Sequence, residues 1–127
     1  MSAAVGQFDG QLATFKAHER PHEKRTYPCY RCLYPEAPPP GTVPSCTEAG
    51  ILGALAGVMG TLQALEAIKE ILSIGDTMAG RLTLYDGLGG TFRTVRVKPD
   101  PACALCGPKA TLRDLSHHSA AEESCTP

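Results

Sequence analysis

The chain has 127 residues, of which 43% are hydrophobic and 20% are charged, and its formal net charge at pH 7 is -1. These values predict one soluble domain with a modest core, and the balanced charge argues against nucleic acid as a partner because it gives no basic field. The sequence does not begin with a basic segment followed by a long apolar run, so no secretory signal is visible and we expect a cytoplasmic protein.

The first predicted element is a β-hairpin near the N-terminus. Two short segments, residues 5–8 and 11–15, flank Asp9-Gly10, a dipeptide that suits a two-residue type I′ turn because both turn positions need a positive φ. Residues 18–28 follow without periodicity and are predicted to form a surface loop. A second loop is predicted over residues 35–44, where five prolines exclude a helix or a central strand.

The strongest helical pattern lies in the middle of the chain. Apolar residues recur there at spacings of three and four, which predicts one long amphipathic helix; they are Ile51, Leu55, Val58, Leu62, Leu65, Ile68 and Leu72. Ser45 and Glu48 have the spacing of a capping box, which predicts that the helix starts there. Gly75 is predicted to end it.

The composition of this predicted helix is unusual in one respect. Gly53, Gly57 and Gly60 each lower its intrinsic propensity by about 1 kcal/mol relative to alanine, which predicts that another backbone packs closely against it. Polar residues interrupt the apolar stretch before it reaches the roughly 20 residues of a membrane span. We therefore expect a buried helix and no membrane.

A second hairpin and a tail complete the predicted elements. Residues 81–86 and 91–97 alternate apolar and polar side chains around four turn residues, 87–90, three of which are glycine. No helix follows these glycines to supply an amide dipole, so a turn is favoured over a phosphate-binding loop. Residues 108–127 have no repeated apolar face and are predicted to form a flexible tail.

Two C-x-x-C motifs carry the clearest chemistry. Cys29 and Cys32 form the first, Cys103 and Cys106 form the second, and 70 residues separate them. Four thiolates at this local spacing are typical of a closed tetrahedral zinc site, and a reducing cytosol favours metal over disulfides. Four sulfur ligands leave no coordination position for water, so the zinc is predicted to be structural. A dithiol redox motif or unligated buried cysteines are the alternatives.

Four stretches of the chain together resemble one protein family. Residues 28–36, 46–53, 57–69 and 103–107 closely resemble motifs of the MoeB/ThiF/HesA family of ubiquitin-activating-type enzymes, and they occur in the family's order. The molybdopterin-synthase adenylyltransferase branch is the most similar. The resemblance implies an α/β fold over residues 1–107: the C-terminal portion of a Rossmann-like ThiF-type domain, with a mixed sheet, one long helix and a zinc knuckle of four cysteines.

The same resemblance implies a function and a partner. Members of the family use ATP and magnesium to adenylate the C-terminal glycine of a ubiquitin-like sulfur carrier for molybdopterin, thiamine or tRNA-thiolation pathways. The family's glycine-rich nucleotide loop, ATP-contacting basic residues and magnesium-binding Asp lie upstream of the position that matches Met1. We therefore expect ATP and magnesium only in the full-length enzyme, a carrier ending in Gly-Gly as partner, and an isolated chain that is inactive alone.

The missing neighbours also predict an assembly. Without the preceding strands the sheet has an exposed edge, and the helix with its glycine-bearing face lacks a companion. A homodimer, or pairing with a full-length homologue, is the expected consequence.

Cys46 is the one residue for which covalent chemistry is predicted. As the first helical residue it would have a lowered pKa, because the amide dipoles stabilise a thiolate, and some branches of the family use a cysteine at the matching position for a thioester or for sulfur transfer. An unreactive cysteine in a loop is an equal alternative.

Two other functions stay open. The chain could be a non-catalytic, zinc-stapled interaction module from a truncated reading frame, which would show no ATP chemistry. It could also be a sulfurtransferase that acts through Cys46, which would need an electropositive pocket that the sequence does not display.

Overall fold

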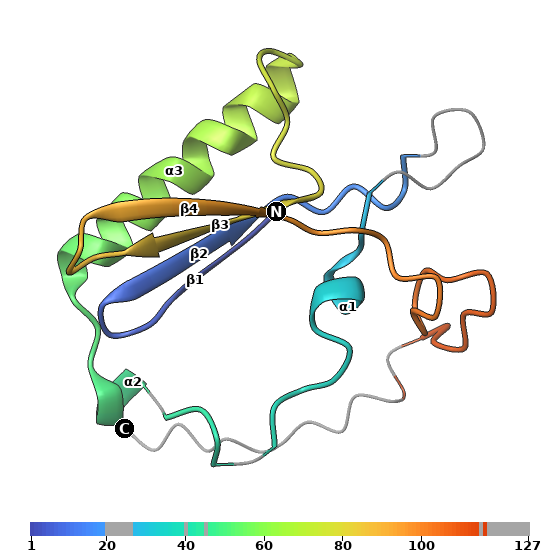
Figure 1. The fold of residues 1–127 in the computed structure, drawn as a ribbon, viewed down its shortest axis with the longest axis horizontal. Coiled ribbons are helices and arrows are strands. Elements are labelled where there is room, and N and C mark those ends of the chain that lie inside the picture. Colours follow the sequence, from blue (N-terminus) through green and yellow to red (C-terminus); the bar gives the residue numbers. More distant parts are fainter. Residues whose placement is uncertain (20–26, 40, 45, 115, 117–127) are drawn as a thin grey trace.

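The computed structural model describes residues 1–19, 27–39, 41–44, 46–114 and 116. It shows a four-stranded sheet with one long helix across one face, and with the loops gathered beyond the sheet (Figure 1). The strands are β1 (Ser2–Val5), β2 (Asp9–Ala13), β3 (Arg81–Asp86) and β4 (Thr91–Arg96). The helices are α1 (Tyr30–Leu33), α2 (Cys46–Ala49) and α3 (Gly53–Leu72). The predicted α/β class and the single long helix are confirmed.

The sheet is antiparallel throughout its named strands, so the prediction of a mixed sheet is wrong for the described residues. The strands lie in chain order, β1-β2-β3-β4, and the one parallel contact is an isolated bridge between Thr14 and Ala79. The direction of α3 explains this, because the helix runs alongside β2: Met59 packs on Gly10, and Glu70 bonds to Lys16 beyond the strand. The chain therefore leaves α3 where β2 ends, and β3 must run back.

The first hairpin is confirmed, but its turn lies earlier than predicted. Gly6 N donates to Asp9 O at 2.8 Å, which closes the turn, and Gly10 sits inside β2 opposite Val5. The reason for a glycine at this position is packing, since a Cβ there would lie 2.6 Å from Cγ of Met59. The dipeptide that suggested a turn is therefore a site of close contact with α3.

The second hairpin has the predicted strands and the predicted turn. Asp86 Oδ1 accepts hydrogen bonds from Leu88 N and Gly89 N, both at 3.0 Å, and Gly90 has a φ of +63°. An acidic side chain that caps a turn in this way, followed by a glycine in the left-handed region, needs no tertiary contact to form. Local sequence therefore predicts this element well.

The N-terminal part of the predicted helix is wrong, because α2 and α3 are separate. Gly50 adopts a φ of +70°, in the left-handed region, which ends α2. Leu52 N then donates to Gln7 O at 3.4 Å and fastens the chain to the turn between β1 and β2 before α3 starts. Ser45, the predicted cap, lies outside the described residues.

The left-handed residue that ends α3 is Ser73, two residues before the predicted glycine. Ser73 has a φ of 53°, and Ile74 N donates to Lys69 O at 3.1 Å. This 6→1 bond satisfies a carbonyl of the last turn. Gly75 also has a positive φ, of 64°, but it follows the end that Ser73 makes.

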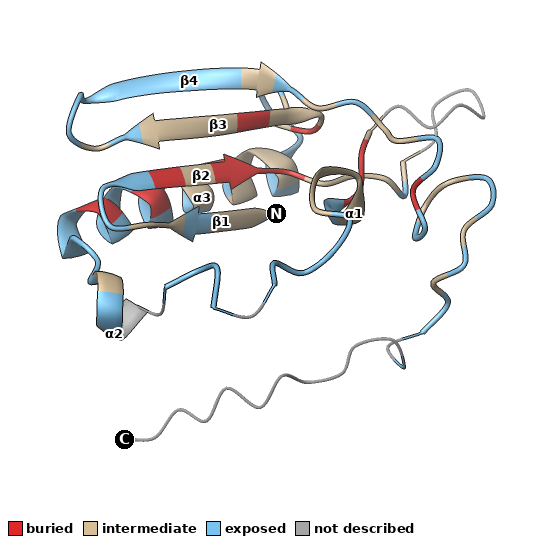
Figure 2. Cartoon of the chain, turned by 60° about the horizontal axis from the view of Figure 1, so that its bottom comes forward, coloured by how far each residue is buried: buried red, intermediate tan, exposed pale blue. Residues whose placement is uncertain are grey.

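The core lies between α3 and the first two strands. Leu12, Leu55 and Met59 are buried together, with Val5 and Tyr85 packed at the margin. Figure 2 shows buried residues along β2 and on the side of α3 that faces it. Among the described residues, no long helix lies over the opposite face of the sheet.

The other side of α3 is uncovered. Leu65, Ile68 and Leu72 are half exposed or more, at 51%, 50% and 60%. Apart from the adjacent residues and the backbone of α3 itself, no described atom lies within 4 Å of a Cβ placed on Gly53 or Gly57, so the close backbone neighbour predicted from the glycines is not found within the described chain. Of the helices described, none combines the length and apolar character that crossing a membrane requires.

Substitution of two glycines by alanine should have opposite effects on stability. Gly87→Ala would place a Cβ 2.7 Å from Phe8 O, the atom to which Gly87 N already donates, so we expect a loss of about 1–3 kcal/mol. Gly57→Ala meets no neighbour and should raise stability by about 0.5–1 kcal/mol through helix propensity. Urea unfolding at low protein concentration measures both. An equal loss for the two variants would contradict the contacts described for these glycines.

Candidate metal centre

The first cysteine pair is placed by a short helical turn. Cys29 is the residue before α1, and Cys32 N donates to Cys29 O at 3.1 Å, which folds the C-x-x-C segment so that both sulfur atoms point the same way. Pro28, directly before it, is among the most buried side chains of the chain. The buried proline anchors the turn to the rest of the fold.

The second pair lies on a tight turn that requires a glycine. Gly107 N donates to Cys103 O at 2.8 Å, and a Cβ on Gly107 would lie 2.5 Å from that same oxygen. Beyond it, Thr111 N and Leu112 N both donate to Ala104 O, at 2.8 and 3.0 Å. The residues just after Gly107 thus contact the knuckle, while the predicted tail beyond Ser116 lies outside the described residues.

The structure brings the four predicted cysteines together. Their sulfur atoms all lie within 4.8 Å of one another. Cys29 Sγ is 3.8 Å from Cys32 Sγ, 3.6 Å from Cys103 Sγ and 3.1 Å from Cys106 Sγ. Tetrahedral zinc with bonds of about 2.3 Å places its sulfur ligands about 3.8 Å apart, whereas a disulfide needs about 2.05 Å. The group has the size of a metal site and contains no disulfide.

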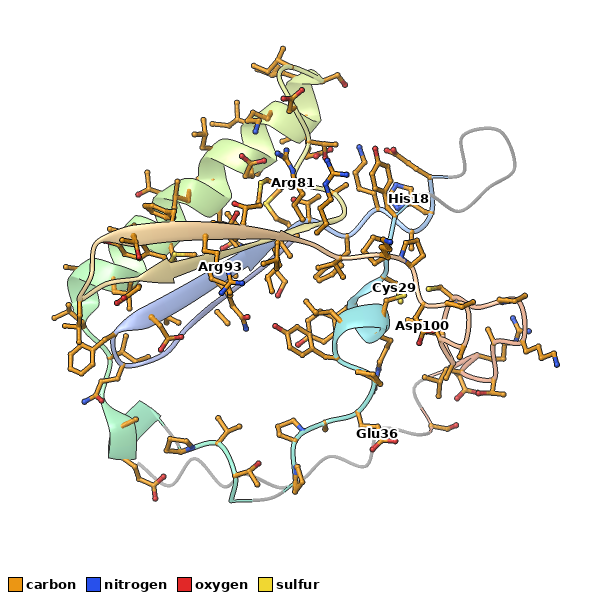
Figure 3. All side chains as sticks on the ribbon, viewed as in Figure 1. His18, Cys29, Glu36, Arg81, Arg93 and Asp100 are labelled. Carbon is orange, nitrogen blue, oxygen red and sulfur yellow. The ribbon has the colours of Figure 1, made fainter. Side chains whose placement is uncertain are left out.

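The four cysteines are partly shielded from solvent, and one of their sulfur atoms accepts a hydrogen bond from the backbone. Cys29 and Cys103 are only 8% and 4% exposed, and Asp100 N donates to Cys32 Sγ at 3.4 Å. Figure 3 shows Cys29 and Asp100 beside each other between α1 and the loop that follows β4. A backbone N–H directed at sulfur stabilises a thiolate, as outer groups of metal sites commonly do.

The thiols of the cluster do not ionise independently of one another. Burial raises the pKa of Cys29 and, together with the neighbouring sulfur atoms, that of Cys106. Burial also acts to raise the pKa of Cys103, but backbone N–H groups of Cys106 and Leu105 and the adjacent thiols lower it to about 7. Four thiols this close cannot all ionise unless a positive ion is shared among them. These residues could hold a metal ion.

The backbone of Cys46 lies on a different element from these four cysteines. Its backbone begins α2, which lies apart from α1 in both Figure 1 and Figure 2. The predicted position as a first helical residue is confirmed for a helix of only four residues.

Sequence reasoning missed the aromatic surroundings of the knuckle. Tyr34 Oη donates to Gln11 Oε1 at 2.8 Å, and the Tyr30 ring lies 5.0 Å from the Tyr34 ring. Next to them is a cavity of about 320 Å³ that is also lined by Ala37 and Pro38 of the proline-rich loop. Tyrosine at both ends of the helical turn was the available signal, because residues four apart lie on one side of a helix.

Comparison with known proteins gives a consistent result. The ThiF family model matches residues 1–105. The chain is 49% identical over 92% of its length to a sulfur carrier protein adenylyltransferase of Thermus thermophilus, of which it covers 42%. It is 45% identical over 82% of its length to the SAMP-activating enzyme E1 of Haloferax volcanii, covering 36% of that protein. It is 40% identical over 98% of its length to adenylyltransferase and sulfurtransferase MOCS3 of Bos taurus, covering 27%. The chain thus spans less than half of each of these relatives.

Proposed function

The chain belongs to the ThiF family, and from this premise we propose that it forms the carrier-facing part of an ATP-dependent adenylyltransferase, which activates the C-terminal glycine of a ubiquitin-like sulfur carrier. The observation that carries the proposal is the likeness to the adenylyltransferase of Thermus thermophilus along nearly the whole chain. Adenylation turns a carboxylate, a poor electrophile, into an acyl adenylate from which AMP leaves readily. A sulfur nucleophile can then attack the carbonyl carbon.

The nucleotide part of this reaction belongs elsewhere in the enzyme. The chain has no G-x-G-x-x-G motif. The outer edge of β1 has no partner among the described strands, and we propose that it continues the sheet of a Rossmann-like ThiF-type domain. ATP and magnesium are then bound by the portion of the relatives that this chain does not cover.

We assign the metal as zinc, held by Cys29, Cys32, Cys103 and Cys106. Four thiolates complete the tetrahedral coordination of the zinc, so the ion would join the two loops and would have no free coordination position for a substrate. The sulfur spacing and the shared burial described above support this assignment. Such thiols stay reduced in the cytosol, where we place the protein.

The open face of the sheet supports a docking role. Leu84 and Arg93 lie opposite each other on β3 and β4, and Leu84 pairs with Gln11 of β2, so the three share the face away from α3. This face leads to Tyr34, which bonds to Gln11, and so to the cavity beside the proline-rich loop. We propose that the carrier's globular part rests on the face and that its narrow Gly-Gly tail enters the cavity.

A titration tests this role. We expect a carrier that ends in Gly-Gly to bind the zinc-loaded chain in calorimetry, and a carrier without its last two glycines to bind at least tenfold more weakly. Arg93→Glu reverses a charge on the docking face and should weaken binding by a similar factor. Phe92→Ala is the matched control, because Phe92 is 53% exposed but belongs to the other face of the same strand. Equal binding by both carriers would contradict the proposal.

Cys46 keeps its predicted covalent role as part of the proposal. Its thiolate would attack the acyl adenylate and form a thioester with release of AMP, or it would accept a sulfane sulfur from a separate persulfide donor, which keeps the thiol. Cys46→Ser should then leave carrier binding and zinc content unchanged and abolish a thiol-labile carrier–enzyme adduct in the complete enzyme. An adduct that persists in the variant would assign the chemistry to another residue.

The uncovered side of α3 supports pairing of two copies. Small residues occupy its first half, including Gly53, Gly57 and Gly60, whereas Leu65 and Ile68 are among the large residues of its second half. A two-fold axis across the helix would place the large half of one copy over the small half of the other. All three charged residues of α3 are already in ion pairs within the chain, so no charge opposes such a contact.

A further inference from the structure

A second cavity lies away from the metal centre, where β3 begins and β4 ends. Its volume is about 480 Å³, and its lining includes Tyr27, Asp76, Arg81, Arg96 and Lys98. Three of these side chains are cationic and one is anionic. The cavity is therefore electropositive in a chain whose formal net charge is -1.

The two arginines face each other without a described counterion. Arg81 and Arg96 are direct cross-strand partners in the register of β3 and β4. Like charges in such positions destabilise a sheet unless something neutralises them. Among the ion pairs of the described residues, none involves Arg81, Arg96 or Lys98.

The position of Lys98 follows from the same ladder. Val97 N donates to Gly80 O at 2.8 Å, so the strand pairing continues one step beyond β4. Side chains two residues apart on an extended strand point to the same side, which brings Lys98 to the side of Arg96. Both side chains are exposed and able to close on a ligand.

One side of the cavity is already fixed. The Arg81 guanidinium donates to the carbonyl oxygens of Asp76 and Thr77, which orients it at the wall of the cavity (Figure 3). Gly80 has a φ of +74°, and a Cβ built on it would lie 3.6 Å from the Tyr27 ring. One arginine is thus held in place before any ligand arrives.

We propose that this cavity binds a phosphate-type oxyanion. Guanidinium groups present planar pairs of N–H donors that match the oxygens of phosphate, and the ammonium group of Lys98 adds a third positive charge. With Asp76 counted, the lining has two excess positive charges, which a phosphate group carrying about -1.5 to -2 at pH 7 balances and a single carboxylate does not. The site extends the proposed function and does not depend on carrier binding.

Calorimetry of the zinc-loaded chain with inorganic phosphate at fixed ionic strength is the test. We expect saturable binding of one phosphate per chain and a loss of about tenfold in affinity for Arg96→Gln, because a charge-assisted hydrogen bond is removed. Arg96→Lys keeps the charge and should retain most of the affinity. Arg93→Gln is the matched control, since it removes the same charge from the opposite face of the same strand.

Two further ligands identify the source of the oxyanion. Equal affinity for AMP and free phosphate would indicate a site for the bare anion, and tighter binding of AMP or pyrophosphate would indicate a phosphate group of a larger molecule. Either result supports the proposal. Absence of saturable phosphate binding by the folded chain, or equal loss in Arg93→Gln and Arg96→Gln, would overturn it. The cavity contains Arg96, whereas the carrier face contains Arg93 on the opposite side of β4. Phosphate binding can therefore fail while carrier binding succeeds.

Discussion

Cys103→Ser is expected to abolish stoichiometric zinc binding and to cause a large loss of stability. Cys103 is 4% exposed and lies 3.6 Å from Cys29, a residue 74 positions away in sequence. A cross-link that closes a loop of this length stabilises a fold by on the order of 4 kcal/mol through the entropy of the unfolded chain. Elemental analysis and thermal unfolding of the variant measure both effects.

The control for this experiment is Cys46→Ser. It removes one thiol from a different part of the fold and should leave both the zinc content and the melting temperature unchanged. Full zinc content in Cys103→Ser would show that the four-cysteine site is not where the metal binds. Unchanged stability after a chelator has removed the zinc would show that the ion does not join the loops.

Zinc binding should also depend on pH in a defined direction. The metal binds thiolates, so binding releases protons and is weakened as the pH falls. The pKa of Cys103 is about 7, and burial raises the pKa of Cys29 above its usual range. We expect the affinity to rise with pH above neutrality and the zinc to be lost on acidification, as a chromogenic chelator would report.

Ile68→Asp is expected to convert a paired chain into a monomer. Ile68 is 50% exposed on the uncovered side of α3, and pairing would bury it against the small residues of a second copy. Placing an unpaired carboxylate in an apolar contact costs several kcal/mol. We expect this cost to exceed the free energy of association through one pair of helices about 30 Å long. Light scattering after size exclusion measures the mass directly.

A matched variant tests whether the effect is specific to this face of α3 or follows from charging any exposed apolar residue. Leu88→Asp changes a residue that is 75% exposed in the turn between β3 and β4, and it should leave the assembly unchanged. A monomeric wild-type chain at high micromolar concentration would contradict self-pairing through α3. Dissociation of both variants would show that another surface makes the contact.

Some elements were predictable because their information is local. The turn of the second hairpin depends on Asp86 and Gly90, and its strands appear where the alternation begins and ends. The first hairpin shows the limit of such reasoning. Gly10 marks close packing by Met59, a residue 49 positions later, and no local pattern carries that information.

The direction of β3 and the break between α2 and α3 could not be predicted from local sequence, because both depend on tertiary contacts. The apolar pattern that begins at Ile51 continues smoothly, but the bond from Leu52 N to Gln7 O and the positive φ of Gly50 interrupt it. The antiparallel course of β3 follows from α3 lying along β2. Neither relation is visible until both segments are placed.

The candidate sites divide in the same way. The C-x-x-C spacing predicts each half of the metal centre, and the structure adds that the two halves meet. The electropositive cavity was missed because Arg81 and Arg96 are separated in sequence and meet only through the register of the hairpin. Its position at that end of the sheet also separates it from α2, where Cys46 lies (Figure 1).

ATP–pyrophosphate exchange in the presence of a Gly-Gly-ended carrier tests the central claim most directly. The zinc-loaded chain should show no exchange alone, and exchange should appear when the separately produced N-terminal portion of a relative is added. Exchange by the chain alone would contradict the claim that the nucleotide site lies outside it. Absence of exchange in the mixture, with both parts folded, would contradict the assignment as a carrier-facing part of an adenylyltransferase.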